Sequence, residues 1–189
     1  DGAKYIMMPG NAKKRHPIVE ERTNALIEYA ETAEINRFED GEDKAVGFIT
    51  SSTSYQYVKE VFGDKYPVLK LGMIYPMPVN LLKYFAAKVD RLVVVEELDG
   101  FIEEHCNSIG LKVEGKEIFS LIDELSQNKI AEKFGLAPES GITLDENIPN
   151  RPPVMCAGCP HRGLFYILAK NKLTVMGDIG CYTLGAVPP

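Results

Sequence analysis

The sequence contains no tryptophan, no excess of positive charge and no long hydrophobic run. Its 27 acidic residues outnumber its 21 lysines and arginines, and the net charge of −6 argues against a nucleic-acid-binding surface. No apolar stretch approaches the roughly 20 residues that a membrane-spanning helix requires. With 45% hydrophobic and 25% charged residues, the 189-residue chain has the composition of a globular protein that binds neither nucleic acid nor a membrane.

Cysteine is also scarce. The four cysteines, two of which form one Cys-x-x-Cys pair, do not resemble the disulfide framework of a small secreted protein. We therefore expect a cytoplasmic protein whose thiols have metal-binding or redox roles. The chain begins at Asp1 without an initiator methionine, and we interpret it as an internal piece of a longer protein.

Residues 44–136 alternate short apolar runs with helical segments. The runs predict strands at 45–50, 68–71 and 91–95, with a short one at 112–113, and the segments between and after them predict helices at 55–62, 79–89, 100–109, 118–125 and 127–135. Such alternation predicts an α/β domain in three layers (α/β/α), with a mostly parallel sheet covered on both faces. The most continuously apolar runs, 45–49 and 91–95, should supply its central strand.

The flanking segments have a different composition. A helix predicted from Pro17 to about Ala33, after a turn at Met8–Asn11, makes residues 1–43 a helical connector from an upstream domain. Prolines and a glycine between residues 137 and 153 indicate a linker. Residues 154–189, with a helix expected at 163–171 and a strand at 173–176, would then begin a second domain.

Polar residues follow two of the predicted strands, and each group has two interpretations. Ser51–Ser54 precede a helix, where they would either bind phosphate or cap the helix. The pair Glu96–Glu97 ends a strand at the edge where open α/β sheets bind ligands. The alternative is that Glu97 and Asp99 cap the next helix. His105 and Cys106 are interpreted as a surface histidine and a buried cysteine.

Three of the four cysteines lie near the C-terminal end of the chain, in two glycine-bearing turns that bracket a helix. Pro160 suits the first helical position, so Cys159 should lie beside a helix N-terminus, where thiolates are stabilised. Glycine lets the backbone approach a ligand closely. The pattern therefore indicates a cofactor site rather than a packing motif.

The sequence alone allows several chemical roles for Cys156, Cys159 and Cys181. Thiolates ligate iron–sulfur clusters, commonly through a Cys-x-x-Cys pair and distant partners, but a fourth ligand is not evident here. Structural zinc would need His161 as its fourth ligand, close behind Cys159 in sequence. The Cys-x-x-Cys pair also fits a redox-active dithiol, and cysteines that only shape a pocket would show the same spacing.

Two motifs in this region carry a family resemblance. Cys-x-Gly-Cys-Pro-His-Arg at 156–162, followed by Gly-Asp-Ile-Gly-Cys-Tyr-Thr-Leu-Gly at 177–185, resembles the start of the thiamine-pyrophosphate domain in α subunits of the indolepyruvate ferredoxin oxidoreductases. These enzymes belong to the 2-oxoacid:ferredoxin oxidoreductases. The segments 49–60, 69–78 and 94–99 resemble the family's transketolase C-terminal-like domain. The sequence departs from the family at Ser52 and Ala157, in place of glycine and proline, and at Gly100, in place of proline.

The resemblance implies an enzyme that oxidatively decarboxylates an aryl 2-oxoacid, indolepyruvate, to acyl-CoA with ferredoxin as electron acceptor. It implies thiamine pyrophosphate, Mg²⁺ and [4Fe-4S] clusters as cofactors, and ferredoxin, coenzyme A and a second (β) subunit as partners. The cofactor-binding residues it implies are Cys156, Gly158, Cys159, His161, Gly177, Asp178, Gly180 and Cys181, with the three cysteines as iron–sulfur ligands. The catalytic glutamate and the Mg²⁺ ligands of the family have no counterpart here, so the chain alone should be inactive.

A function of a different class is also open. The chain could be a non-catalytic α/β assembly module with a zinc- or cluster-stabilised cysteine tail. In either case the two motifs should meet in space, because a helix followed by a returning strand would bring Cys181 back toward Cys159.

Overall fold

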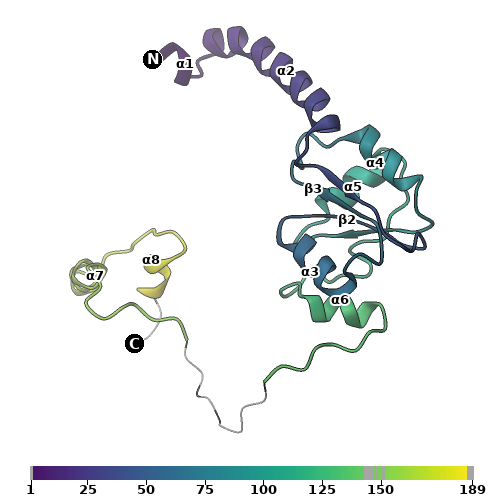
Figure 1. The fold of residues 1–189 in the computed structure, drawn as a ribbon. Coiled ribbons are helices and arrows are strands. Elements are labelled where there is room, and N and C mark those ends of the chain that lie inside the picture. The colour runs from purple at the N-terminus through teal and green to yellow at the C-terminus, as the bar shows by residue number, and fades with distance from the viewer. Residues whose placement is uncertain (1, 143–146, 148, 150–151, 187–189) are drawn as a thin grey trace. The chain divides into compact units, whose positions relative to one another are not determined.

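The computed structural model describes residues 2–142, 147, 149 and 152–186, and it divides into two compact units. Unit 1 spans Asp1–Ser140 and unit 2 spans Gly141–Pro189, and each is described by itself (Figure 1). Among the described residues, no helix is long and apolar enough to cross a membrane.

Unit 1 begins with α1 (Gly2–Tyr5) and the long helix α2 (Pro9–Thr32). The turn predicted at Met8–Asn11 is wrong, because Pro9 opens α2 at a position that suits proline. The helix also continues through Pro17, the residue at which the sequence predicts its start. The last turn of α2 joins the sheet unit: Ala30 is buried, and the Glu31 carboxylate accepts the backbone N–H groups of Asn80 and Leu81, both at 2.9 Å.

The sheet has four strands in the order β1-β3-β2-β4. Their bounds are β1 Arg37–Glu39, β2 Gly47–Ser51, β3 Val68–Leu71 and β4 Leu92–Val95. Strand β2 pairs in parallel with both β3 and β4, which confirms the predicted parallel sheet. Strand β1 pairs antiparallel to β3 and was missed, because its three residues lie at the start of an acidic run that indicates a loop.

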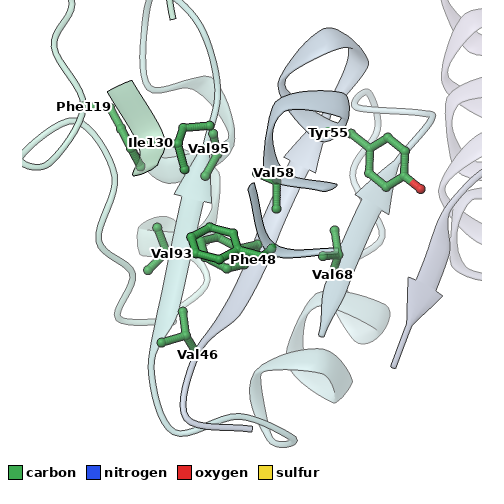
Figure 2. Close-up of a cluster of buried hydrophobic side chains, with 10 residues drawn as sticks. Val46, Phe48, Tyr55, Val58, Val68, Val93, Val95, Phe119 and Ile130 are labelled. Atoms are coloured by element: carbon green, nitrogen blue, oxygen red, sulfur yellow. The ribbon is translucent and has the colours of Figure 1, made fainter. Parts of the chain in front are cut away.

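Helices cover both faces of this sheet, as predicted. On one face α3 (Ser52–Phe62) and α6 (Gln127–Lys133) bury Val58 and Ile130 against Phe48 of β2 (Figure 2). On the other face, α4 (Val79–Ala86) and α5 (Phe101–Ser108) bury apolar side chains such as Leu82 against Ile49. Successive residues of a strand point to opposite faces, so adjacent apolar residues in β2 hold two cores together.

Of the two runs expected at the centre, β2 is internal and β4 lies at the edge of the strand order. Strand β4 is nevertheless buried throughout. Its outer edge is covered by Glu114, which forms an isolated parallel bridge with Val93. The Val94 N–H donates to the Glu114 carbonyl at 2.8 Å, and the Glu114 N–H donates to the Leu92 carbonyl at 3.0 Å. The strand predicted at 112–113 is reduced to this single bridge.

Two predicted elements are absent. The helix expected at 118–125 is a series of turns and bends, in which Phe119 is buried while Leu121 and Ile122 are exposed. Ile118 and Leu125 pack partly buried against the same core as Phe119, but residues 120–124 between them are exposed, so the segment has no continuous apolar face. In unit 2 the strand expected at 173–176 has no strand partner among the described residues. Unit 2 contains α7 (His161–Lys170) and the short α8 (Cys181–Leu184), and neither has a buried residue.

Val94→Asp tests the double-sided burial of unit 1. Val94 is 1% exposed, so the substitution places an unpaired carboxylate in the core, at a cost on the order of 3–5 kcal/mol. That is a large share of a domain's stability. We therefore expect the variant to lose the cooperative urea-unfolding transition, as measured by far-UV circular dichroism. Ile122→Asp, at a residue 73% exposed, is the matched control. Equal transition midpoints for the two variants would contradict the assignment of Val94 to the core.

Candidate functional site

The first cysteine motif forms a tight turn that leads into α7. The Cys159 N–H donates to the Cys156 carbonyl at 3.2 Å, and the Arg162 N–H donates to the Cys159 carbonyl at 3.1 Å. Gly158 has a φ of 71°, in the left-handed region, and a Cβ added there would meet nothing within 4 Å. The backbone conformation, rather than a lack of space, therefore requires glycine at this position.

The Arg162 side chain holds this turn in place. Its Nε donates to the Cys156 carbonyl at 3.2 Å, and its Nη2 donates to the Met155 carbonyl at 2.8 Å. The guanidinium fork thus bonds two successive carbonyls that precede the helix. Sequence reasoning did not assign Arg162 a role, although it belongs to the motif that carried the resemblance.

The second motif forms a turn closed by α8. Gly180, with a φ of 120°, immediately precedes this helix, and its carbonyl accepts the Leu184 N–H at 3.3 Å. The Thr183 hydroxyl donates to the Asp178 carbonyl at 3.2 Å. Asp178 and Gly180 are therefore fixed by the helix that follows them, and not by the strand that we predicted before them.

Three aromatic rings join the two motifs. The His161 ring stacks on Phe165 with centroids 5.8 Å apart, and the same ring lies 5.4 Å from Tyr182. Phe165 and Tyr182 complete the set at 5.6 Å. We call His161, Phe165 and Tyr182 the aromatic trio. Because His161 belongs to the first motif and Tyr182 to the second, the trio brings the two motifs to one place.

A hollow of about 420 Å³ lies beside the trio. It is lined by residues of α7, of the segment before α8, and of α8, including Phe165, Leu168, Val175, Asp178 and Tyr182. Gly185 also lines it, and a Cβ on Gly185 would lie 2.5 Å from Cε2 of Phe165. This glycine therefore lets the chain pass directly over the Phe165 ring.

The three cysteines of the tail are free thiols. Cys156 and Cys181 are exposed, and Cys159 is partly exposed. Three thiols are chemically suited to an iron–sulfur cluster, but no three His, Cys, Asp or Glu side chains of the described residues are grouped so as to hold a metal ion. Cluster ligation by Cys156, Cys159 and Cys181 remains a prediction, and no chemical step is assigned to it.

The other candidates lie at the carboxyl edge of the unit 1 sheet. A hollow of about 260 Å³ is lined there by Ser51–Ser54, Glu96, Glu97 and Asp99. Neither proposed cap residue caps α5: the buried Glu96 does so instead, because its carboxylate accepts the N–H groups of Ile102 at 2.8 Å and Glu103 at 3.0 Å. Burial raises the pKa of Glu96, and these two hydrogen bonds oppose that rise.

The remaining candidates behave as structural residues. Ser51, at the N-cap of α3, makes no capping hydrogen bond through its side chain, so neither interpretation of Ser51–Ser54 is supported by a contact. Cys106 is fully buried, and burial raises the pKa of its thiol to about 12. It therefore stays protonated and inert at neutral pH, as expected of a buried cysteine. His105 is partly exposed.

Gly185→Val tests the aromatic trio. The added side chain would occupy the space of the Phe165 ring, so we expect Phe165 to move and the His161 and Tyr182 rings to separate. Ring-current shifts of the His161 and Tyr182 proton resonances should collapse toward random-coil values, while resonances of unit 1 stay unchanged. Gly163→Ala, where an added Cβ meets nothing within 4 Å, is the control. Unchanged ring-current shifts in Gly185→Val would refute the trio.

Comparison of the sequence with known proteins shows the family to which the chain belongs. No family profile matches the chain. Curated relatives named indolepyruvate oxidoreductase subunit IorA do match: the Pyrococcus horikoshii protein is 34% identical over 98% of the chain, and the Thermococcus kodakarensis protein is 32% identical over 100%. The Methanothermobacter thermautotrophicus protein is 34% identical over 100% of the chain. The chain spans about a third of the length of each, at 33%, 33% and 35%.

A solved structure supports the fold. It is a 2-oxoglutarate:ferredoxin oxidoreductase from Magnetococcus marinus with 2-oxoglutarate, coenzyme A and succinyl-CoA bound, and it covers 68% of the chain with a TM-score of 0.52. The identity is 18%, and the match takes in 23% of the solved chain, so the likeness concerns the α/β architecture alone. The sequence matches place this chain in the indolepyruvate oxidoreductase IorA family, of whose members it spans about one third.

Proposed function

We propose that this chain is part of an oxidoreductase that oxidatively decarboxylates an aryl 2-oxoacid, indolepyruvate, to acyl-CoA with ferredoxin as electron acceptor. The observation that carries the proposal is the 32–34% identity to subunits named indolepyruvate oxidoreductase IorA over nearly the whole chain. The non-catalytic assembly module is not favoured, because these relatives are named as enzyme subunits.

Within that enzyme, unit 2 would form one wall of a thiamine pyrophosphate site. Bound there, the cofactor would supply the electron sink for decarboxylation. The two left-handed glycines, Gly158 and Gly180, present backbone without a Cβ at the turns of the two motifs. The His161 ring contacts both Phe165 and Tyr182, which restricts its orientation next to both turns. A fixed side chain contributes positioning without losing further entropy in the reaction.

The same wall would include the other residues singled out in the sequence. Gly177 and Asp178 lie in the second turn with Gly180, and Cys156 and Cys159 lie in the first. The three tail thiols would donate to a [4Fe-4S] cluster with a fourth ligand from elsewhere in the enzyme, and Mg²⁺ would accompany the diphosphate through residues other than these. Zinc ligation remains the alternative for the thiols, and visible absorption of anaerobically prepared enzyme distinguishes the two.

The partners follow from the same assignment. Ferredoxin would accept the electrons, coenzyme A the acyl group, and a second (β) subunit would complete the enzyme in the cytoplasm. The names of the relatives favour an aryl substrate, whereas the solved neighbour has 2-oxoglutarate bound. The aryl assignment therefore rests on the relatives, which are nearer in sequence.

A chimera tests the proposal. The matched third of the Pyrococcus horikoshii subunit is replaced by this chain, and the chimera is produced with its native partner subunit. We expect CoA-dependent reduction of a viologen dye with indolepyruvate, and little with 2-oxoglutarate. His161→Ala in the chimera should lower kcat at least tenfold while the chimera stays folded at the assay temperature, because unit 1 has its own core and the ring acts by positioning reactants.

One control variant and two contradicting outcomes make the test decisive. Lys170→Ala, at an exposed charged position of the same helix outside the trio, should leave kcat within twofold. A folded chimera that reduces the dye with 2-oxoglutarate but not with indolepyruvate would contradict the aryl assignment. A folded chimera inactive with every 2-oxoacid would contradict the proposed function.

A further inference from the structure

Two of the three thiols of unit 2 lie in a single reverse turn. The Cys159 N–H donates to the Cys156 carbonyl at 3.2 Å, which is the hydrogen bond that closes a four-residue β-turn. Gly158, the third residue of this turn, has a φ of 71°, as a type II turn requires. The α-carbons of the first and last residues of a β-turn are less than about 7 Å apart. Those of Cys156 and Cys159 therefore lie close to the separations at which two cysteines form a disulfide.

Arg162 holds both ends of this turn. Its guanidinium group donates to the Cys156 carbonyl at 3.2 Å and to the Met155 carbonyl at 2.8 Å. Its backbone N–H donates to the Cys159 carbonyl at 3.1 Å. Two reacting groups that are held in place meet far more often than two groups on a flexible loop. The contacts of Arg162 therefore favour a reaction between the two thiols.

The two thiols of the turn are also accessible. Cys156 is exposed and Cys159 is partly exposed, so a small reagent in solution can reach them. Cys106, in contrast, is fully buried in unit 1. Cys181 is exposed, but no three His, Cys, Asp or Glu side chains of the described residues are grouped so as to hold a metal ion, so Cys181 is not gathered with the other two. The turn is therefore the place where the fold holds two accessible thiols together.

We propose that Cys156 and Cys159 form a reversible intramolecular disulfide, which low-molecular-weight disulfides such as oxidised glutathione introduce and small thiols remove. The Cys156 thiolate, at the more exposed of the two residues, attacks one sulfur of the small disulfide, forms a mixed disulfide and releases one small thiol. The Cys159 thiolate then attacks the Cys156 sulfur and releases the second small thiol. The protons of the two cysteines leave with the two small thiols, so one disulfide is reduced as one is formed.

This disulfide and metal ligation exclude each other. The thiolate is the form of cysteine that binds a metal, and a sulfur in a disulfide is no longer a thiolate. Oxidation of the turn would therefore remove Cys156 and Cys159 from any set of cluster ligands until a small thiol reduced them. This consequence rests on the proposed function, whereas the disulfide itself depends only on the geometry of the turn.

Redox equilibration of the 189-residue chain tests the proposal. The chain is equilibrated under nitrogen in buffers of reduced and oxidised glutathione, quenched with acid, alkylated and mapped by mass spectrometry. We expect the peptide that contains residues 156–159 to become two hydrogens lighter, with half conversion inside the range that these buffers cover. Dithiothreitol should restore both hydrogens. Cys106 should stay reduced throughout, because the core of unit 1 shields it.

Variants separate the effect of the turn from mere closeness in sequence. Gly158→Val places a β-branched residue at a left-handed φ, and Arg162→Ala removes the two side-chain hydrogen bonds to the turn. Each should lower the equilibrium constant for disulfide formation at least about threefold, because the two thiols then meet less often. Lys170→Ala, which removes an exposed cation of the same helix, is the matched control for Arg162→Ala and should leave the constant unchanged. Cys181→Ser should also leave it unchanged.

Three outcomes would overturn the proposal. A native chain that stays reduced in every buffer, or that stops at glutathione adducts, would show that the turn keeps the two sulfurs apart. A predominant disulfide from Cys181 to either residue of the turn would place the reactive pair across the two motifs. Equilibrium constants like that of the native chain in both Gly158→Val and Arg162→Ala would show that the turn does not organise the pair.

Discussion

The fold depends on one constraint, which is that β2 must be buried on both of its faces. Phe48 and Ile49 are adjacent in sequence, both fully buried, and they enter two different cores. Neither core can form without the strand between them, and the strand cannot be buried without helices on both sides. The sheet order follows, because β3 and β4 pair with β2 and thereby enclose it. Unit 1 satisfies this constraint with its own residues.

Unit 2, in contrast, does not bury its apolar residues in a core of its own. Its helix α7 carries apolar residues on every side. Leu164, Tyr166 and Ile167 are exposed, and Phe165 packs within the aromatic trio and under Gly185. A helix that is apolar all round is normally buried in a core. The two cysteine motifs are thus held together by three rings rather than by a sheet. This arrangement agrees with a chain that spans a third of its relatives and that would supply one wall of a larger site.

The sequence predicted unit 1 well where local pattern and burial agree. Strand β3 and the starts of α4 and α5 lie within two residues of their predicted positions, because apolar periodicity marks them. Strand β1 was missed because three residues carry too little periodicity, and its position depends on pairing with β3. The helix expected at 118–125 is absent because residues 120–124 stay exposed, which leaves the segment without a continuous apolar face in the core. Tertiary contacts, which a single sequence does not display, decided both cases.

For the candidate site, the motifs were visible in the sequence but the contact that joins them was not. Gly158 and Gly180 adopt the left-handed conformations that their residue type suggests. The meeting of His161 with Tyr182 arises from packing against Phe165, a residue with no chemistry of its own. Arg162 was overlooked for a similar reason, since its bonds go to backbone carbonyls that no motif specifies. The predicted caps of α5, Glu97 and Asp99, were wrong. The carboxylate that caps this helix is that of the buried Glu96, and burial cannot be read from position in the sequence.

The central claim is that unit 1 completes its own core whereas unit 2 does not. Hydrogen–deuterium exchange of the 189-residue chain, resolved by peptide, tests this claim most directly. The account predicts slow exchange for the amides of β2 and β4, close to the limit set by global unfolding, and exchange faster by orders of magnitude for α7. Protection of α7 equal to that of β2 in the monomeric chain would contradict it.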